Sequence, residues 1–196
     1  MARPAIHHRT PEFSAMLDSA RERLKPLFGT QQEVILMAAS GTGAMEAAVT
    51  NLVAPGEHAI FVNGGKFGER WGRLLAAYGA VGHEVNSEWG RAVRPEQVED
   101  ALKAHPEARA VFIQACETSS CAVHPVAEIG EVTRQRGVML VVDGITSVGV
   151  FEQRMDEWGI DACYSCTQKG IGAPPGLAPW AGTHVTVVAT GVAADS

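Results

Sequence analysis

The sequence predicts an α/β fold: a three-layer αβα arrangement around a mostly parallel sheet of about seven strands. Short apolar runs of strand length alternate with stretches of helical spacing, which is the pattern of βα units. Several of these runs are apolar throughout, so helices should cover both faces of the sheet. At 196 residues the chain is long enough for one sizeable domain of this kind.

The first expected element is an amphipathic helix over residues 11–28, with Thr10 as its N-cap and Gly29 as its stop. Strands are expected over residues 34–39, 59–62, 81–85, 110–115, 138–143 and 160–165. Helices are expected between them, over residues 43–54, 67–78, 95–104 and 125–136. The last 16 residues contain no Lys or Arg and have the composition of a final strand with a frayed end.

Composition and charge exclude several classes of partner. The formal net charge is -6 and the pI is near 5.6, whereas a nucleic-acid or anionic-membrane surface would be basic. The N-terminus has no signal-peptide core, and no apolar run reaches the length of a membrane span. We therefore expect a cytoplasmic protein that binds small molecules or other proteins.

The four cysteines raise the question of a metal site, since Cys163 and Cys166 form a C-x-x-C pair and Cys116 and Cys121 a C-x4-C pair. Cys163 lies at the end of an expected strand, where residues three apart point to opposite faces. Neither pair is followed by a glycine-rich knuckle. Buried structural cysteines are therefore favoured over a metal or redox site, and no metal ligand is assigned.

The loops that follow the strands should carry the chemistry, because ligands of such sheets bind beyond the carboxyl ends of the strands. Ser40, Gly41 and Thr42 lead directly into a helix, whose N-terminus suits a phosphate. A plain N-cap by Ser40 or Thr42 explains this loop equally well. A dinucleotide site is disfavoured because Glu46 occupies the third glycine position, and a P-loop is disfavoured because no Lys-Ser or Lys-Thr follows.

Further candidate groups lie at or after the ends of other strands. Phe67 offers a ring for stacking, the segment after the fourth strand supplies hydroxyls, and Asp143 is a carboxylate that needs a partner if it is buried and charged. Taken alone, Asp143 is better explained as a helix cap and Phe67 as a packing anchor. Lys169 stands before a Gly- and Pro-rich turn. Together these groups are what pyridoxal 5′-phosphate requires, with Asp143 on the ring nitrogen and Lys169 forming a Schiff base.

Three segments carry a resemblance to a known family: residues 40–48, 142–147 and 167–176. The chain resembles class V aminotransferases of the alanine:glyoxylate and serine:pyruvate type, which are fold-type I pyridoxal-phosphate enzymes. The resemblance implies transamination between alanine or serine and glyoxylate or pyruvate, and a homodimer in the full-length family. It implies two catalytic residues, Lys169 and Asp143. It also implies cofactor contacts from Ser40, Gly41, Thr42, Phe67, Thr118, Asp143, Gln168 and Lys169.

The family pattern also predicts a division of the chain. Residues 1–30 form an N-terminal segment with its helix, residues 31–180 form the pyridoxal-phosphate-binding large domain, and residues 181–196 form an atypical tail. Family members continue into a small C-terminal domain that carries the arginine for the substrate carboxylate, and the tail does not resemble that continuation. The alternative expectation is therefore a non-catalytic, cofactor-binding remnant of such an enzyme.

Overall fold

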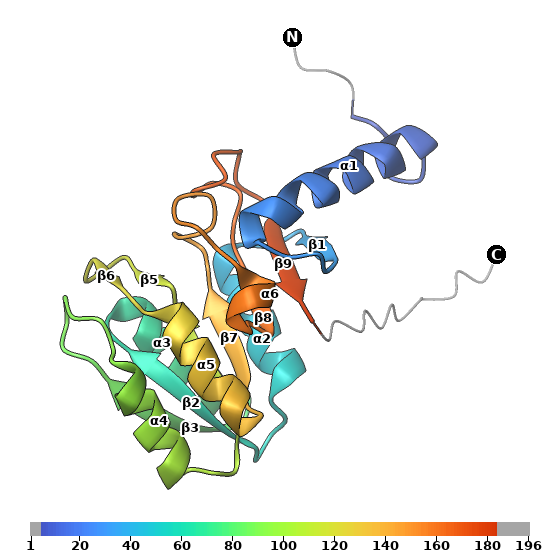
Figure 1. Cartoon of the computed structure of the whole chain (residues 1–196). Helices are drawn as coiled ribbons and strands as arrows, with labels where there is room; N and C mark the ends of the chain where they lie inside the picture. Colours follow the sequence, from blue (N-terminus) through green and yellow to red (C-terminus); the bar gives the residue numbers. More distant parts are fainter. Residues whose placement is uncertain (1–4, 184–196) are drawn as a thin grey trace.

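A seven-stranded sheet has the order β1-β9-β8-β7-β4-β2-β3 in the computed structural model, which describes residues 5–183 (Figure 1). Its strands are β1 (Val34–Met37), β2 (His58–Asn63), β3 (Val81–Asn86), β4 (Ala108–Gln114), β7 (Met139–Asp143), β8 (Ala162–Tyr164) and β9 (Ala178–Gly182). Only β9 runs against the others, pairing antiparallel with β1 and β8. The expected fold, a mostly parallel sheet of about seven strands between helices, is confirmed.

The helices are α1 (Pro11–Phe28), α2 (Gly41–Leu52), α3 (Lys66–Ala77), α4 (Pro95–Ala104), α5 (Val126–Arg136) and α6 (Met155–Trp158). Side chains of α2 and α3 form one hydrophobic core with one face of the sheet, and side chains of α4 and α5 form a second core with the other face (Figure 1). Among the helices of residues 5–183, none is both long and apolar enough to cross a membrane.

The central strands supply both cores by alternation. Val111 and Ile113 of β4 belong to the core under α4 and α5, whereas Phe112 between them packs with α2 and α3. The neighbouring strand β7 alternates in the same way: Val142 belongs to the core under α4 and α5, and Val141 packs with α2 and α3. Both sides of these strands are therefore buried, which is why their sequences are apolar throughout.

Helix α1 begins and ends where the sequence predicts. The Thr10 hydroxyl accepts the Phe13 backbone N–H at 3.3 Å, and Gly29 closes the helix at a φ of 63°. Phe28 is the only residue of α1 that is buried, and Met16 is 52% exposed. The apolar stripe of this helix therefore remains largely uncovered by residues 5–183.

Besides the short helix α6, two further features of the fold were not predicted from the sequence. Strand β9 begins at Ala178, and a short hairpin, β5 (Cys116–Glu117) with β6 (Ala122–Val123), follows β4. The expected final strand lies in the last 16 residues, of which Ala181 and Gly182 belong to β9. Residues 184–196, where the rest of that expected strand falls, lie outside the described residues.

Candidate active site

A pocket of about 200 Å³ lies beyond the carboxyl ends of the parallel strands. It is lined by all eight residues that the sequence singles out: Ser40, Gly41, Thr42, Phe67, Thr118, Asp143, Gln168 and Lys169. Five other residues complete the lining: Arg70, Cys116, Ile145, Thr146 and Cys166. The fold thus brings five separate loops to one place.

One end of the pocket is the N-terminus of α2. Ser40 caps this helix, its hydroxyl accepting the Gly43 backbone N–H at 3.2 Å. The Thr42 hydroxyl accepts a hydrogen bond from the Arg70 guanidinium at 2.9 Å. An α-helix leaves its first N–H groups without intrahelical partners and carries a partial positive charge there. With Arg70 added, this end of the pocket suits an anion.

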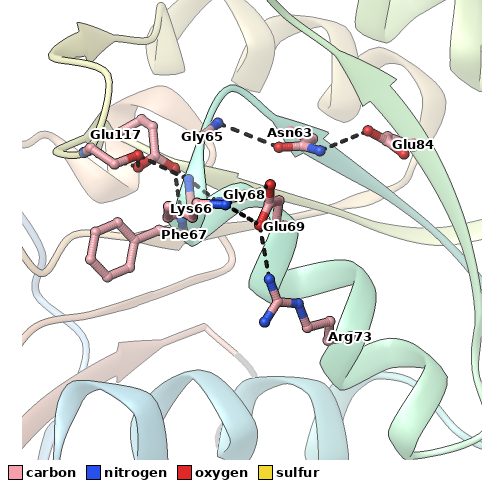
Figure 2. A network of polar contacts seen from close by, with 10 residues as sticks. Asn63, Gly65, Lys66, Phe67, Gly68, Glu69, Arg73, Glu84 and Glu117 are labelled. Carbon is pink, nitrogen blue, oxygen red and sulfur yellow. Dashed lines mark hydrogen bonds and ion pairs between the residues drawn. The ribbon is translucent and has the colours of Figure 1, made fainter. Parts of the chain in front are cut away.

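Helix α3 is fixed at its N-terminus by a buried carboxylate on the β5–β6 hairpin. One oxygen of Glu117 accepts the backbone N–H groups of Phe67 and Gly68, at 3.1 and 2.9 Å (Figure 2). Its other oxygen accepts the Ser119 hydroxyl at 2.6 Å. A Cβ on Gly65 would lie 2.7 Å from the Glu117 carboxyl carbon, so the close approach requires glycine at this position.

The same first turn of α3 presents an aromatic ring and a cation to the pocket. Phe67 is half-buried, and the Arg70 guanidinium carbon lies 5.2 Å from the centre of its ring. This is within the range of a cation–π contact. Arg70 therefore contacts both the Phe67 ring and the Thr42 hydroxyl, and it links α3 to the N-terminus of α2.

Asp143 ends β7 and is buried at the floor of the pocket, with 5% of its surface exposed. One carboxylate oxygen accepts the Ile145 backbone N–H at 2.9 Å, and the Tyr164 hydroxyl on the neighbouring strand β8 interacts with the carboxylate without a well-formed hydrogen bond. Burial raises the pKa of Asp143 to about 6, against a smaller lowering by the Ile145 N–H. Residues 144–150 form turns and no helix, so Asp143 does not act as a helix cap.

Lys169 and Gln168 lie in the turn after β8, which is closed by the Gly172 N–H donating to the Lys169 carbonyl at 2.9 Å. Both residues line the pocket, yet both are exposed. The described residues alone therefore do not desolvate the Lys169 amine. On the other side of the pocket, the Thr118 hydroxyl contacts the Thr146 hydroxyl at 3.0 Å.

The cysteines only partly match the expectation of buried structural residues. Cys163 and Cys166 are buried, and burial raises the pKa of both thiols. Cys116 is half-buried and Cys121 is exposed, so burial does not describe that pair. All four are free thiols.

Sequence reasoning did not single out Arg70, Glu117 or Tyr164 as contributors. Arg70 directly follows Glu69 and precedes Arg73 by three residues, in a charged stretch where a solvated side chain is the ordinary interpretation. Glu117 lies in a polar loop with nothing in its sequence to indicate burial. Tyr164 is buried on β8 beside Asp143; its hydroxyl makes no well-formed hydrogen bond among residues 5–183, yet its interaction with the Asp143 carboxylate lowers the pKa of that carboxyl. The one available signal was its position at the end of a strand beside Asp143.

Comparison with known proteins places this arrangement in context. The family model described as Aminotransferase class-V matches residues 1–183. An uncharacterized aminotransferase of Methanocaldococcus jannaschii is 36% identical over 91% of this chain and 46% of its own length. An L-aspartate–glyoxylate aminotransferase of Paracoccus denitrificans is 35% identical over 89% of this chain and 46% of its own length.

A solved structure agrees with these sequence relatives. The crystal structure of an alanine–glyoxylate aminotransferase from Nostoc sp. superposes with a TM-score of 0.89 and 33% identity, covering 92% of this chain and 48% of that one. The chain spans about half the length of the curated relatives it matches.

Proposed function

Because this chain belongs to the class-V aminotransferase family, we propose that its pocket binds pyridoxal 5′-phosphate and serves transamination between a small amino acid and an oxo acid. Alanine or serine is the proposed amino donor, and glyoxylate or pyruvate the proposed acceptor. Glyoxylate is supported by the names of the Paracoccus and Nostoc relatives, which pair it with aspartate and alanine respectively.

The observation that carries the proposal is the placement of Asp143 and Lys169 in one pocket with the N-terminus of α2. A buried carboxylate, a primary amine and an anion site come from three loops that are far apart in sequence. Each feature alone has an ordinary structural explanation. Their convergence around a pocket of about 200 Å³ matches the ring nitrogen, aldehyde and phosphate of a single cofactor.

Both the charges and the hydrogen-bonding groups of these residues fit this cofactor. Asp143 accepts one well-formed hydrogen bond among residues 5–183, and a protonated ring nitrogen would supply both a second donor and a positive charge. The phosphate would meet the helix N-terminus, the Ser40 and Thr42 hydroxyls and the Arg70 guanidinium. Gln168 would add a polar contact on the same side.

When bound, pyridoxal 5′-phosphate supplies an electron sink for the charge that develops at the substrate α-carbon. Asp143 would hold the proton on the ring nitrogen, which keeps that sink effective. Phe67 would pack against the ring, and the Thr118 hydroxyl would contact its phenolic oxygen. Lys169 would carry the cofactor before substrate arrives and then move a proton to and from the α-carbon as general base and acid.

Binding is tested by incubating the purified chain with pyridoxal 5′-phosphate, reducing with borohydride and mapping the modified peptide by mass spectrometry. We expect the reduced adduct on Lys169 and its loss in Lys169→Ala. Lys66→Ala is the matched control, since Lys66 is an exposed lysine that pairs with Glu69 near the pocket. Equal labelling of several exposed lysines, unchanged in Lys169→Ala, would contradict the proposal.

Turnover is a separate measurement, because a cofactor-binding remnant would also form the adduct. Glycine formation from glyoxylate, with alanine, serine or aspartate supplied in parallel assays, identifies the donor. A labelled Lys169 without any turnover would favour the remnant.

We also propose a homodimer, since Lys169 and Gln168 leave one side of the pocket exposed. Sedimentation velocity with and without cofactor measures that state.

A further inference from the structure

A second cluster of side chains that can ligate metal lies toward the amino ends of the strands, away from the pocket at their carboxyl ends. His58 begins β2, His83 lies in β3, and Glu107 directly precedes β4. These three strands are neighbours in the order β4-β2-β3. His58 is five residues before Asn63, where β2 reaches the pocket side, so the two sites are separated by about 17 Å along the strand.

The donor atoms of this cluster converge. His58 Nδ1 lies 3.0 Å from His83 Nε2 and 2.8 Å from the Glu107 carboxylate oxygen Oε1. The same Glu107 oxygen is 3.9 Å from His83 Nε2. Ligands about 2.0 to 2.2 Å from a tetrahedral zinc ion are separated from one another by about 3.3 Å. The three atoms therefore already stand near the spacing of a metal coordination shell.

We propose that His58, His83 and Glu107 form a binding site for a divalent transition-metal ion such as Zn²⁺, with water in the fourth position. Two imidazoles and one carboxylate are the ligand set of several three-residue zinc sites. Ca²⁺ and Mg²⁺ are disfavoured, because both prefer a shell of oxygen ligands.

Neighbouring groups support this ligand set. The His105 ring stacks on His83, with centroids 3.5 Å apart, and His105 Nδ1 lies 3.6 Å from the Glu107 carboxylate. The stacking limits rotation of the His83 ring. The His105 Nδ1 atom lies beside the Glu107 carboxylate, where metal sites often have a polar group that orients a ligand.

The site would join the edge strand β3 to its neighbours. His83 is half-buried on the side of the sheet that α4 covers, and Glu107 lies between the end of α4 and β4. A metal ion held there would connect β2, β3 and the α4–β4 loop, and it would stabilise the native state by mass action.

The test uses the untagged chain, so that no added histidine tract binds metal, and Zn²⁺ as the probe. Equilibrium dialysis against a zinc buffer is expected to give one ion per chain, with the melting temperature rising as zinc is added. His83→Gln and Glu107→Gln should each weaken zinc binding by roughly 100-fold or more, because each removes a direct ligand. Cys121→Ser, which alters an exposed thiol elsewhere, should leave the affinity unchanged.

Co²⁺ substitution identifies the ligand atoms. A tetrahedral visible spectrum without thiolate charge-transfer bands, lost in His83→Gln, supports the histidine and carboxylate site. Three results would overturn the proposal: no stoichiometric zinc binding at micromolar concentrations, thiolate bands that disappear in cysteine variants, or the same affinity in wild type and Glu107→Gln. Because cofactor labelling of Lys169 is measured separately, loss of zinc binding leaves the proposed aminotransferase function untouched.

Discussion

The Glu117 carboxylate accepts the Gly68 backbone N–H at 2.9 Å, although 49 residues separate the two in the chain. Glu117 is completely buried, and the same oxygen also accepts the Phe67 N–H. The carboxylate thereby satisfies free N–H groups in the first turn of α3 and complements the positive end of its dipole. The position of Phe67 in the pocket therefore depends on the β5–β6 hairpin.

Replacing Glu117 by alanine should destabilise the protein by about 2 to 4 kcal/mol, because it leaves buried backbone donors unpaired and removes charge-assisted hydrogen bonds. Glu117→Gln, which keeps the shape and one acceptor, should cost about half as much. Urea unfolding measures both. The matched control is Glu84→Gln, because the exposed Glu84 carboxylate accepts the Asn63 side chain at the surface; this change should cost under about 1 kcal/mol. Equal losses in the Glu84 and Glu117 variants would refute the anchoring role.

Asp143 predicts a pH dependence of stability in the cofactor-free chain. Its pKa is raised from 3.8 to about 6, so the native state holds this proton more tightly than the unfolded state does. The stabilising contribution is therefore complete below about pH 4 and is lost as the pH rises through about 6. Relative to Asp143→Asn, the wild type should lose about 2 to 2.5 kcal/mol of unfolding free energy between pH 4 and pH 7.5.

That difference is measured by urea unfolding of both proteins at several pH values. Asp18→Asn, which changes a carboxylate on the exposed face of α1, serves as control and should parallel the wild type. A wild-type minus Asp143→Asn difference that stays constant across the range would show that Asp143 ionises at its ordinary pKa.

Strand-end positions made most of the site predictable from the sequence. Asp143 was identified because four apolar residues precede it, and Ser40 to Thr42 because small residues lead directly into a helix. In a parallel sheet the carboxyl ends of the strands meet at one edge, so residues far apart in sequence can be expected together. The helix α1 was equally predictable, because Thr10 and Gly29 act through local hydrogen bonds.

Features that depend on tertiary packing were not predictable in this way. The segment Ala178–Gly182 contains Pro179 and no β-branched residue, and it becomes β9 only by pairing with β1 and β8. Arg70 reaches Thr42 only because α3 packs beside α2. His58, His83 and Glu107 are spaced by 25 and 24 positions, and no motif spacing connects them before the strand order is known.

A methyl group at Gly41 should disturb the pocket through one identified neighbour. A Cβ there would lie 2.4 Å from Ile145 Cδ1, the flexible end of a side chain that also lines the pocket. Gly41→Ala should cost about 1 kcal/mol in stability, the low end for overpacking, and weaken cofactor binding, since the Ile145 side chain must move. The double variant Gly41→Ala with Ile145→Ala should recover part of both losses. Simple additivity of the two single variants would indicate that this contact is not the cause.

Arg70 should discriminate between cofactors with and without a phosphate. Its guanidinium donates to the Thr42 hydroxyl at the N-terminus of α2, where the phosphate is proposed to bind. Losing one charge-assisted contact corresponds to roughly 10- to 100-fold in affinity. Arg70→Ala should therefore weaken pyridoxal 5′-phosphate binding by this amount while changing pyridoxal binding little. The control is Arg73→Ala, because Arg73 lies one turn later and pairs with Glu69 outside the pocket lining. If Arg70→Ala reduced the affinity for both compounds equally, the guanidinium would act by holding Phe67 in place, through the cation–π contact at 5.2 Å, and not by binding phosphate.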